Sequence, residues 1–154
     1  MTGIATIAIV KLVLAAVVSA AAVTEDLRHR RIPNMLCAIL LFTGIGSGGF
    51  SRGWTGVTDS LLGATLGCVV FLLPYGLGGM GGGDVKLMSG FGSLTGVQGV
   101  LPALFLVAVG GALTSILYLG FQRLRGQSIA QTIPYAPAIV TGSLLVAFSQ
   151  IGVQ

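Results

Sequence analysis

Charged residues are scarce in this sequence. Of its 154 residues, 8% are charged, with eight Lys and Arg against four Asp and Glu. Soluble domains carry about 25% charged residues, so a chain this poor in charge cannot cover a surface that faces water. The mean hydropathy of +0.97 agrees with that conclusion. The composition excludes an ordinary soluble domain and predicts an all-α integral membrane protein with lipid as its solvent.

Metal-ligand and redox patterns are also missing from the sequence. The single histidine, His29, has no partner at metal-ligand spacing, and Cys37 and Cys68 stand alone in apolar stretches. Residues 76–81 match the pattern G-x-G-x-x-G, but without the strand, turn and helix of a dinucleotide-binding unit. The net charge of +4 gathers in loops, as in membrane topology. We therefore expect no metal, no cofactor and no nucleic-acid partner.

Six apolar runs are separated by polar or glycine-rich turns. They extend over about 4–23, 32–50, 57–77, 84–94, 97–121 and 134–151. Since a helix needs about 20 apolar residues to span a bilayer, the pattern predicts about six transmembrane helices. They would form a single membrane-embedded domain, 1–154. The fourth run is too short to span without a tilt or a thin local bilayer, and Thr95-Gly96 is the predicted turn that follows it.

Loop charges predict the orientation of the chain. If the N-terminus is outside, the outer loops carry only Arg52 as a basic residue. The inner loops then carry Arg28, Arg30, Arg31, Lys86, Arg123 and Arg125. Because cytoplasmic loops carry the excess of Lys and Arg, both termini are predicted outside a cytoplasmic (inner) membrane. The first, third and fifth loops would face the cytoplasm.

The acidic residues are the main functional signal, because ionisable groups beside or within membrane spans are costly. Asp26 follows the first run and Asp84 begins the fourth, so the predicted topology puts both at the cytoplasmic face. Two carboxyl groups a few ångströms apart share one proton, which suits them to activate water and to donate a proton to the developing oxyanion or to the leaving amine. Glu25 offers the same chemistry as Asp26, and periodicity does not choose between them. Asp59 is interpreted as the start of an outer helix.

Each of these features also has a purely structural interpretation. Asp84 suits the N-terminus of a helix, where the helix dipole stabilises an anion, and Asp26 could pair with Arg28 or Arg30. The glycines at 76–83 could pack helices together. They could also leave room beside Asp84 for an extended peptide, because a residue without Cβ lets a backbone approach closely. The residues alone leave these alternatives open.

Three segments resemble the type IV prepilin peptidases. Gly-Met-Gly-Gly-Gly-Asp-Val-Lys-Leu-Met, at 79–88, resembles the GxGD motif of that family. The first-aspartate region of the family resembles Asp26-Leu27-Arg28 with Arg31-Ile32-Pro33-Asn34, and its late proline motif resembles Pro134-Tyr135-Ala136-Pro137-Ala138. The three segments occur in family order, and the resemblance covers nearly the whole chain.

The resemblance implies a GxGD protease-like bundle that cleaves the short, positively charged leader from pilin-like precursors. The family cuts at the cytoplasmic membrane face, after a glycine and before the hydrophobic helix of the pilin. By position, Asp26 and Asp84 match the two catalytic aspartates, which selects Asp26 over Glu25. Supporting motif residues are matched by Gly81, Gly83, Lys86, Pro134 and Pro137. Lys86 is expected to tune the acidity of Asp84 or to meet an acid of the substrate.

The sequence departs from the large members of the family in its cysteines. Those members carry a cytoplasmic cysteine-rich segment and also methylate the new N-terminus, whereas this chain has only Cys37 and Cys68. We therefore expect an aspartic-type endopeptidase without methyltransferase activity, similar to the small peptidases of tight-adherence (Flp-type) pilus systems. The expected partners are the pilin precursor and the lipid bilayer. The sequence leaves open which pilin is cut and whether the chain forms a homo-oligomer.

Two other functions are alternatives. A GxGD protease of the presenilin or signal-peptide-peptidase kind cuts inside the bilayer and carries its first aspartate in a Tyr-Asp pair, whereas Asp26 follows Glu25. A proton-coupled transporter would use Asp84 and Lys11. Transporters often show repeated halves, and no internal repeat is evident in this sequence.

Overall fold

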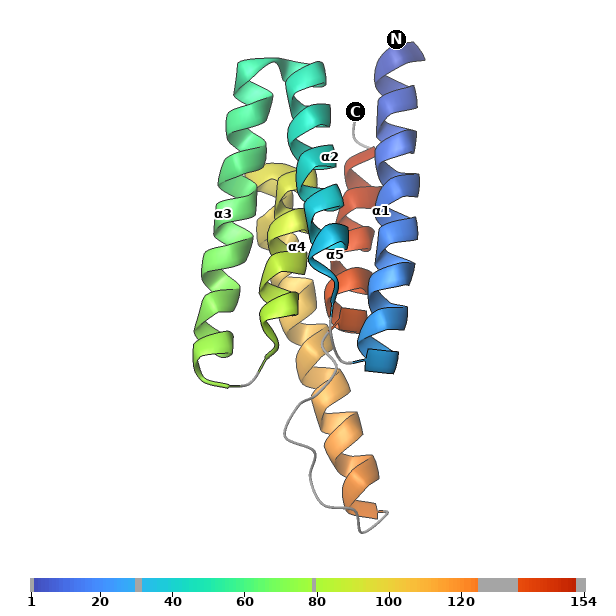
Figure 1. Cartoon of the computed structure of the whole chain (residues 1–154), viewed down its shortest axis with the longest axis vertical. Helices are drawn as coiled ribbons and strands as arrows, with labels where there is room; N and C mark the ends of the chain where they lie inside the picture. Colours follow the sequence, from blue (N-terminus) through green and yellow to red (C-terminus); the bar gives the residue numbers. More distant parts are fainter. Residues whose placement is uncertain (1, 30–31, 79, 125–135, 152–154) are drawn as a thin grey trace.

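The computed structural model describes residues 2–29, 32–78, 80–124 and 136–151, and within these ranges all regular structure is helical. The helices are α1 (Thr2–His29), α2 (Asn34–Arg52), α3 (Trp54–Gly76), α4 (Gly82–Leu124) and α5 (Ala136–Ile151). They pack side by side as a bundle (Figure 1). The prediction of an all-α protein is confirmed for the described residues.

The predicted count of six helices is not confirmed, because the described ranges hold five. The fourth and fifth predicted runs both belong to α4, which has non-helical dihedral angles at Gly96, φ 67° and ψ −174°. Figure 1 shows the chain reversing there, so the first arm of α4 and its second arm run in opposite directions. Glycine suits this position because its positive φ is unfavourable for residues with a Cβ. The predicted turn at Thr95-Gly96 coincides with this reversal.

An acid from another helix caps the start of the second arm of α4. Asp59 lies in the second turn of α3, and its Oδ1 accepts a hydrogen bond from the Val97 N–H at 3.1 Å. Its Oδ2 accepts a bond from Arg52 Nη2 at 2.6 Å, at the end of α2. A helix start leaves backbone N–H groups without intrahelical partners, so Asp59 satisfies one of them. The interpretation of Asp59 as a residue near a helix start agrees with this position, but the helix it caps is α4.

The first arm of α4 lies at the centre of the bundle and is held there by small residues. The backbones of Gly63 in α3 and Gly92 in α4 approach so closely that a Cβ on either would overlap the other. Ser93 Oγ donates a hydrogen bond to the Leu41 carbonyl at 2.9 Å, which joins α4 to α2. Small residues and interhelical hydrogen bonds are the usual means of packing helices in lipid. Leu87, Met88 and Phe91 on the same arm are fully buried.

The outside of the bundle is apolar. Phe42, Phe50 and Phe105 are 69%, 82% and 69% exposed, respectively. Among the described residues, three stretches are long and apolar enough to cross a membrane: Asn34–Arg52, Trp54–Gly76 and Gly82–Leu113. An apolar outer surface of this kind suits contact with lipid. The fold therefore supports a multi-pass membrane protein.

The chain direction puts the two candidate acid-bearing segments at one end. In Figure 1, α1 begins and α5 ends at one end of the bundle, whereas α1 ends and α4 begins at the opposite end. Asp26 is in the last turn of α1 and Asp84 in the first turn of α4. Residues 58 positions apart in sequence are thus brought to the same end of the molecule.

Candidate active site

A cavity of about 260 Å³ opens at this end of the bundle. Its lining consists of Asp26, Ile32, Asn34, Gly81, Gly82, Gly83 and Asp84. The two aspartates come from different helices, α1 and α4, and the remaining residues lie at or just before the starts of α2 and α4. The structure therefore brings together the two carboxyl groups that the sequence placed at the same membrane face.

One carboxylate oxygen of Asp84 is used to start a helix. The Gly81 N–H donates to Asp84 Oδ2 at 3.2 Å, and the Asp84 N–H donates to the Gly81 carbonyl at 3.1 Å. The bond from the N-cap N–H to the side chain of the third helical residue is one half of a capping box. The backbone carbonyl of Gly81 takes the place of the N-cap side chain that glycine lacks. The structural interpretation of Asp84 is correct for Oδ2, which these bonds hold in one orientation.

The other oxygen of Asp84 has a different environment. Asp84 Oδ1 is buried and has no hydrogen-bond partner among the residues that the structure describes. A buried carboxylate oxygen without a partner is costly. Helix capping does not account for it, since capping uses only Oδ2. Such an atom beside a cavity is available to a water molecule or a substrate.

Asp26 enters the cavity and Glu25 does not. Asp26 is half-buried, its Oδ2 is shielded from solvent, and it lies close enough to Asp84 for the two charges to interact. Glu25 instead pairs with His29 Nδ1 at 2.9 Å, where its side chain is 42% exposed. Periodicity did not choose between Asp26 and Glu25, and of the two it is Asp26 that lines the cavity. Arg30 and Arg31 lie outside the described residues.

The three consecutive glycines before Asp84 have different surroundings. A Cβ on Gly83 would lie 3.0 Å from Ile32 Cβ and 3.2 Å from its Cγ1, tighter than ordinary packing. A Cβ on Gly82 would touch the Tyr75 ring at 3.4 Å, and one on Gly81 would meet nothing nearer than Asp84 Oδ2 at 3.6 Å. Gly83 is thus the residue that lets the segment before α2 close over the start of α4.

Lys86 reaches across to the same segment. Its Nζ donates a hydrogen bond to Asn34 Oδ1 at 2.8 Å, which joins the second turn of α4 to the first residue of α2. Lys86 does not line the cavity, whereas Asn34 does. Sequence reasoning gave Asn34 no role. The signal that could have found it is its type and place: an amide side chain directly after Ile32-Pro33, in the segment expected near the first aspartate.

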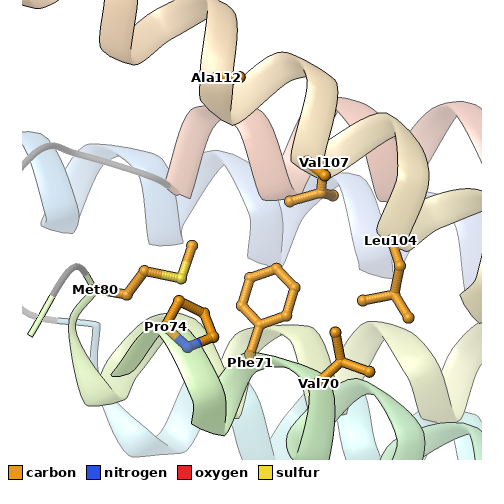
Figure 2. A pocket seen from close by; sticks show the side chains of 8 residues that line it. Val70, Phe71, Pro74, Met80, Leu104, Val107 and Ala112 are labelled. Atoms are coloured by element: carbon orange, nitrogen blue, oxygen red, sulfur yellow. The ribbon is translucent and has the colours of Figure 1, made fainter. Parts of the chain in front are cut away.

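A larger cavity of about 370 Å³ lies between α3 and the second arm of α4. Figure 2 shows its side chains converging on the space between the two helices. The lining residues are Val70, Phe71, Pro74, Met80, Leu104, Val107, Ala108 and Ala112. None carries an acid, a base or a nucleophile, so this cavity supplies shape and no polar chemistry. The candidate for hydrolysis is the smaller cavity with the two aspartates.

The two prolines predicted for the site do not line the cavity in the part of the chain that the structure describes. Pro137 is in the first turn of α5, and Pro134 lies outside the described residues. Of the residues predicted for the site, the structure therefore gathers Asp26, Asp84 and the motif glycines. Within the described ranges, no cluster of three His, Cys, Asp or Glu side chains is placed to hold a metal ion.

The fold and the site define a class: a helical membrane protein with two aspartates from separate helices lining one cavity at the end of the bundle. Comparison with known proteins gives the family. The type IV leader peptidase family matches residues 12–116, more than half of the chain, and the protein belongs to that family. No solved structure matches the chain significantly.

Curated relatives are similar over part of their length. The chain is 30% identical to a prepilin leader peptidase/N-methyltransferase of Xanthomonas campestris pv. campestris over 80% of its own length and 44% of the relative. It is 32% identical to a protein of the same description from Pseudomonas aeruginosa, over 73% of the chain and 40% of the relative. A third, from Bacillus subtilis, is 37% identical over 55% of the chain and 34% of the relative. The chain thus spans less than half the length of these relatives.

Proposed function

We propose that this protein is a membrane aspartyl endopeptidase that removes the leader peptide from type IV pilin-like precursors at the cytoplasmic membrane face. The observation that carries the proposal is the cavity that Asp26 and Asp84 line together. Membership of the type IV leader peptidase family supports the reaction and the substrate class.

The chemistry follows from two carboxyl groups that share a proton. Like charges at close range disfavour double ionisation, so one group is ionised and the other protonated at the working pH. The ionised carboxylate takes a proton from a water molecule, whose oxygen attacks the carbonyl carbon of the scissile bond. The protonated carboxyl then gives its proton to the leaving amine as the carbon–nitrogen bond breaks. The protonation steps belong to the pair, and neither aspartate is assigned one role alone.

The hydrogen bonds of Asp84 suit it to this reaction. The Gly81 N–H fixes Oδ2 at 3.2 Å, which limits the orientations of the carboxyl plane. Oδ1 remains available to water or substrate. A reacting group that is already oriented loses less freedom when the substrate binds, and such positioning is a large part of enzymatic rate enhancement. No metal or cofactor takes part in this mechanism.

Charge supports an orientation with the cavity on the cytoplasmic side. Arg28 lies at the cavity end of α1 and Lys86 near the cavity end of α4, while Arg52 lies at the far end of α2. The excess of basic residues favours the cytoplasmic side, so both termini would face outward. The cavity would then meet the leader of a precursor on the side where that leader is synthesised.

We further propose that the chain cleaves without methylating the product. Cys37 in α2 and Cys68 in α3 are free and lie in apolar helices. They therefore offer no cysteine-rich segment of the kind that accompanies methylation in large members of the family.

A cleavage assay in proteoliposomes tests the proposed function. The purified chain is incubated with a pilin-like precursor, and mass spectrometry locates the cut. A cut at the boundary between leader and hydrophobic helix supports the proposal, whereas a cut within the hydrophobic helix favours the presenilin-like alternative. Absence of any cut together with a proton flux across the liposome membrane would favour a transporter and reject the proposal. Adding S-adenosylmethionine tests methylation, for which the expected result is an unmodified amine.

A further inference from the structure

We propose that Asn34 is a catalytic hydrogen-bond donor, which contacts the carbonyl oxygen of the scissile bond, and that Lys86 is the residue that orients it. The inference rests on the proposed peptide cleavage by Asp26 and Asp84. It adds a third polar side chain to the cavity, one that can donate hydrogen bonds without transferring a proton.

Position is the first argument. Asn34 is the first residue of α2 and lines the same cavity as the two aspartates. The segment that carries it is held against the start of α4, because Ile32 packs directly on Gly83, next to Asp84. The exposed side chain of Asn34 is linked to α4 by its bond to Lys86, and the backbone before it is held by the Ile32–Gly83 contact.

The bond to Lys86 determines which way the amide faces. An ammonium group has three donors and no acceptor, so the atom of Asn34 that meets Lys86 Nζ at 2.8 Å must be the oxygen. The amide is planar, and its Nδ2 therefore points away from Lys86. Among the described residues, the Asn34 side chain has no other hydrogen bond, so both Nδ2 hydrogens are available to a substrate.

A donor at this place would assist the aspartate pair at the carbonyl oxygen. When water attacks, the water oxygen bonds to the carbonyl carbon. The π electrons of the carbonyl group then move to the carbonyl oxygen, which becomes negative. At that stage the pair holds two protons, its own and the one taken from water, and one of them goes to the leaving amine. An Asn34 N–H that donates to the oxygen would stabilise the negative charge without transferring a proton. Removing one preoriented donor of this kind lowers kcat by about 100- to 1,000-fold in well-studied enzymes.

Asn34→Asp and Asn34→Ala both remove the N–H donors, and they differ in whether the oxygen that accepts from Lys86 is kept. The aspartate keeps an oxygen for Lys86 and loses the N–H groups, whereas the alanine loses both and adds no charge. Both variants should lower kcat by about 100-fold and change KM by less than about threefold, because the contact develops in the transition state. Thermal unfolding of each variant in detergent checks that the bundle is intact.

Lys86 variants test the orienting role. Lys86→Met removes the bond and should lower kcat about tenfold, while Lys86→Gln retains a donor toward Asn34 Oδ1 and should recover part of that loss. In the Asn34→Ala background, Lys86→Met should have little further effect, because two residues that act through one interaction are not additive. Equal losses in Lys86→Met and Lys86→Gln, or full additivity with Asn34→Ala, would overturn the orienting role.

The donor role fails separately from the proposed function. If the wild-type chain cuts the precursor and both Asn34 variants keep kcat within about threefold of it, Asn34 is not a catalytic donor and the peptidase proposal still stands. A loss confined to KM would also overturn the donor role. If the wild-type chain cuts no pilin-like precursor, the proposed function fails, and the inference about Asn34 fails with it.

Discussion

Ile32 packs against Gly83 so closely that a Cβ on the glycine would lie 3.0 Å from Ile32 Cβ. This contact brings the segment between α1 and α2 onto the start of α4, beside both aspartates. The space that Gly83 leaves is therefore filled by the protein itself. Gly81 differs, since the nearest atom to a Cβ there is Asp84 Oδ2 at 3.6 Å.

The contact predicts that the two motif glycines differ in their response to alanine. Gly83→Ala should displace Ile32, lower the melting temperature and reduce cleavage by tenfold or more, since overpacking costs about 1–3 kcal/mol. Gly81→Ala should cause the smaller loss in both measurements. Thermal unfolding in detergent and initial cleavage rates provide the comparison. Equal effects of the two substitutions would show that packing of Ile32 is not what requires glycine at 83.

The shared proton predicts a pH profile with two limbs. Cleavage requires one ionised and one protonated carboxyl group, so kcat/KM should fall when both are protonated at low pH and when both are ionised at high pH. Initial rates across the pH range, with the enzyme checked for stability at each pH, measure the profile. Glu25→Gln is the matched control and should keep the same shape, because Glu25 pairs with His29 outside the cavity. A profile with a single limb would contradict the shared-proton mechanism.

Substitution of Asp59 should change the stability of the protein at a place away from the active site. Asp59→Ala removes both the acceptor for the Val97 N–H and the partner of Arg52, whereas Asp59→Asn keeps an oxygen for the N–H. Loss of a helix cap costs about 0.5–2 kcal/mol, and an ion pair at a solvated surface contributes about 0–1 kcal/mol. Arg52 is 61% exposed, so the cap should dominate.

Thermal unfolding of the two Asp59 variants checks this ranking. Asp59→Ala should be clearly less stable than Asp59→Asn, and Asp59→Asn should lie close to wild type. Cleavage by the folded fraction should be retained in both, since Asp59 is at the opposite end of α3 from the cavity. An Asp59→Asn variant as unstable as Asp59→Ala would assign the stabilisation to the charge pair.

Several features of the fold could be predicted from the sequence because they depend on composition or on local pattern. Scarcity of charge predicted a helical membrane protein, and the glycine at 96 marked the reversal within α4. The predicted count of six is not confirmed by the described residues, where the fourth and fifth predicted helices are the two arms of α4 on either side of Gly96. Acids are so rare in this chain that Asp26 and Asp84 were candidates without a structure, and the resemblance to the prepilin peptidases selected Asp26 over Glu25.

Contacts between distant segments could not be predicted in the same way. The bond from Lys86 to Asn34 and the packing of Ile32 on Gly83 join residues about 50 positions apart. Neither contact leaves a periodic signal in the sequence, because each depends on how α2 and α4 are placed in space. The interpretation of Lys86 as a residue that acts directly on Asp84 or on the substrate stays a prediction. Its observed partner is Asn34.

The central claim is that Asp26 and Asp84 together carry out the cleavage. Its most direct test is co-expression of a pilin-like precursor with wild type, Asp26→Asn, Asp84→Asn and Glu25→Gln, read as the shift of the precursor on a gel. Each asparagine keeps the shape of the side chain and removes the titrating acid. The account predicts that both Asp→Asn variants reach the membrane at wild-type levels and abolish cleavage, while Glu25→Gln still cuts. Near wild-type processing by either Asp→Asn variant would show that the residue is not catalytic and would contradict the mechanism.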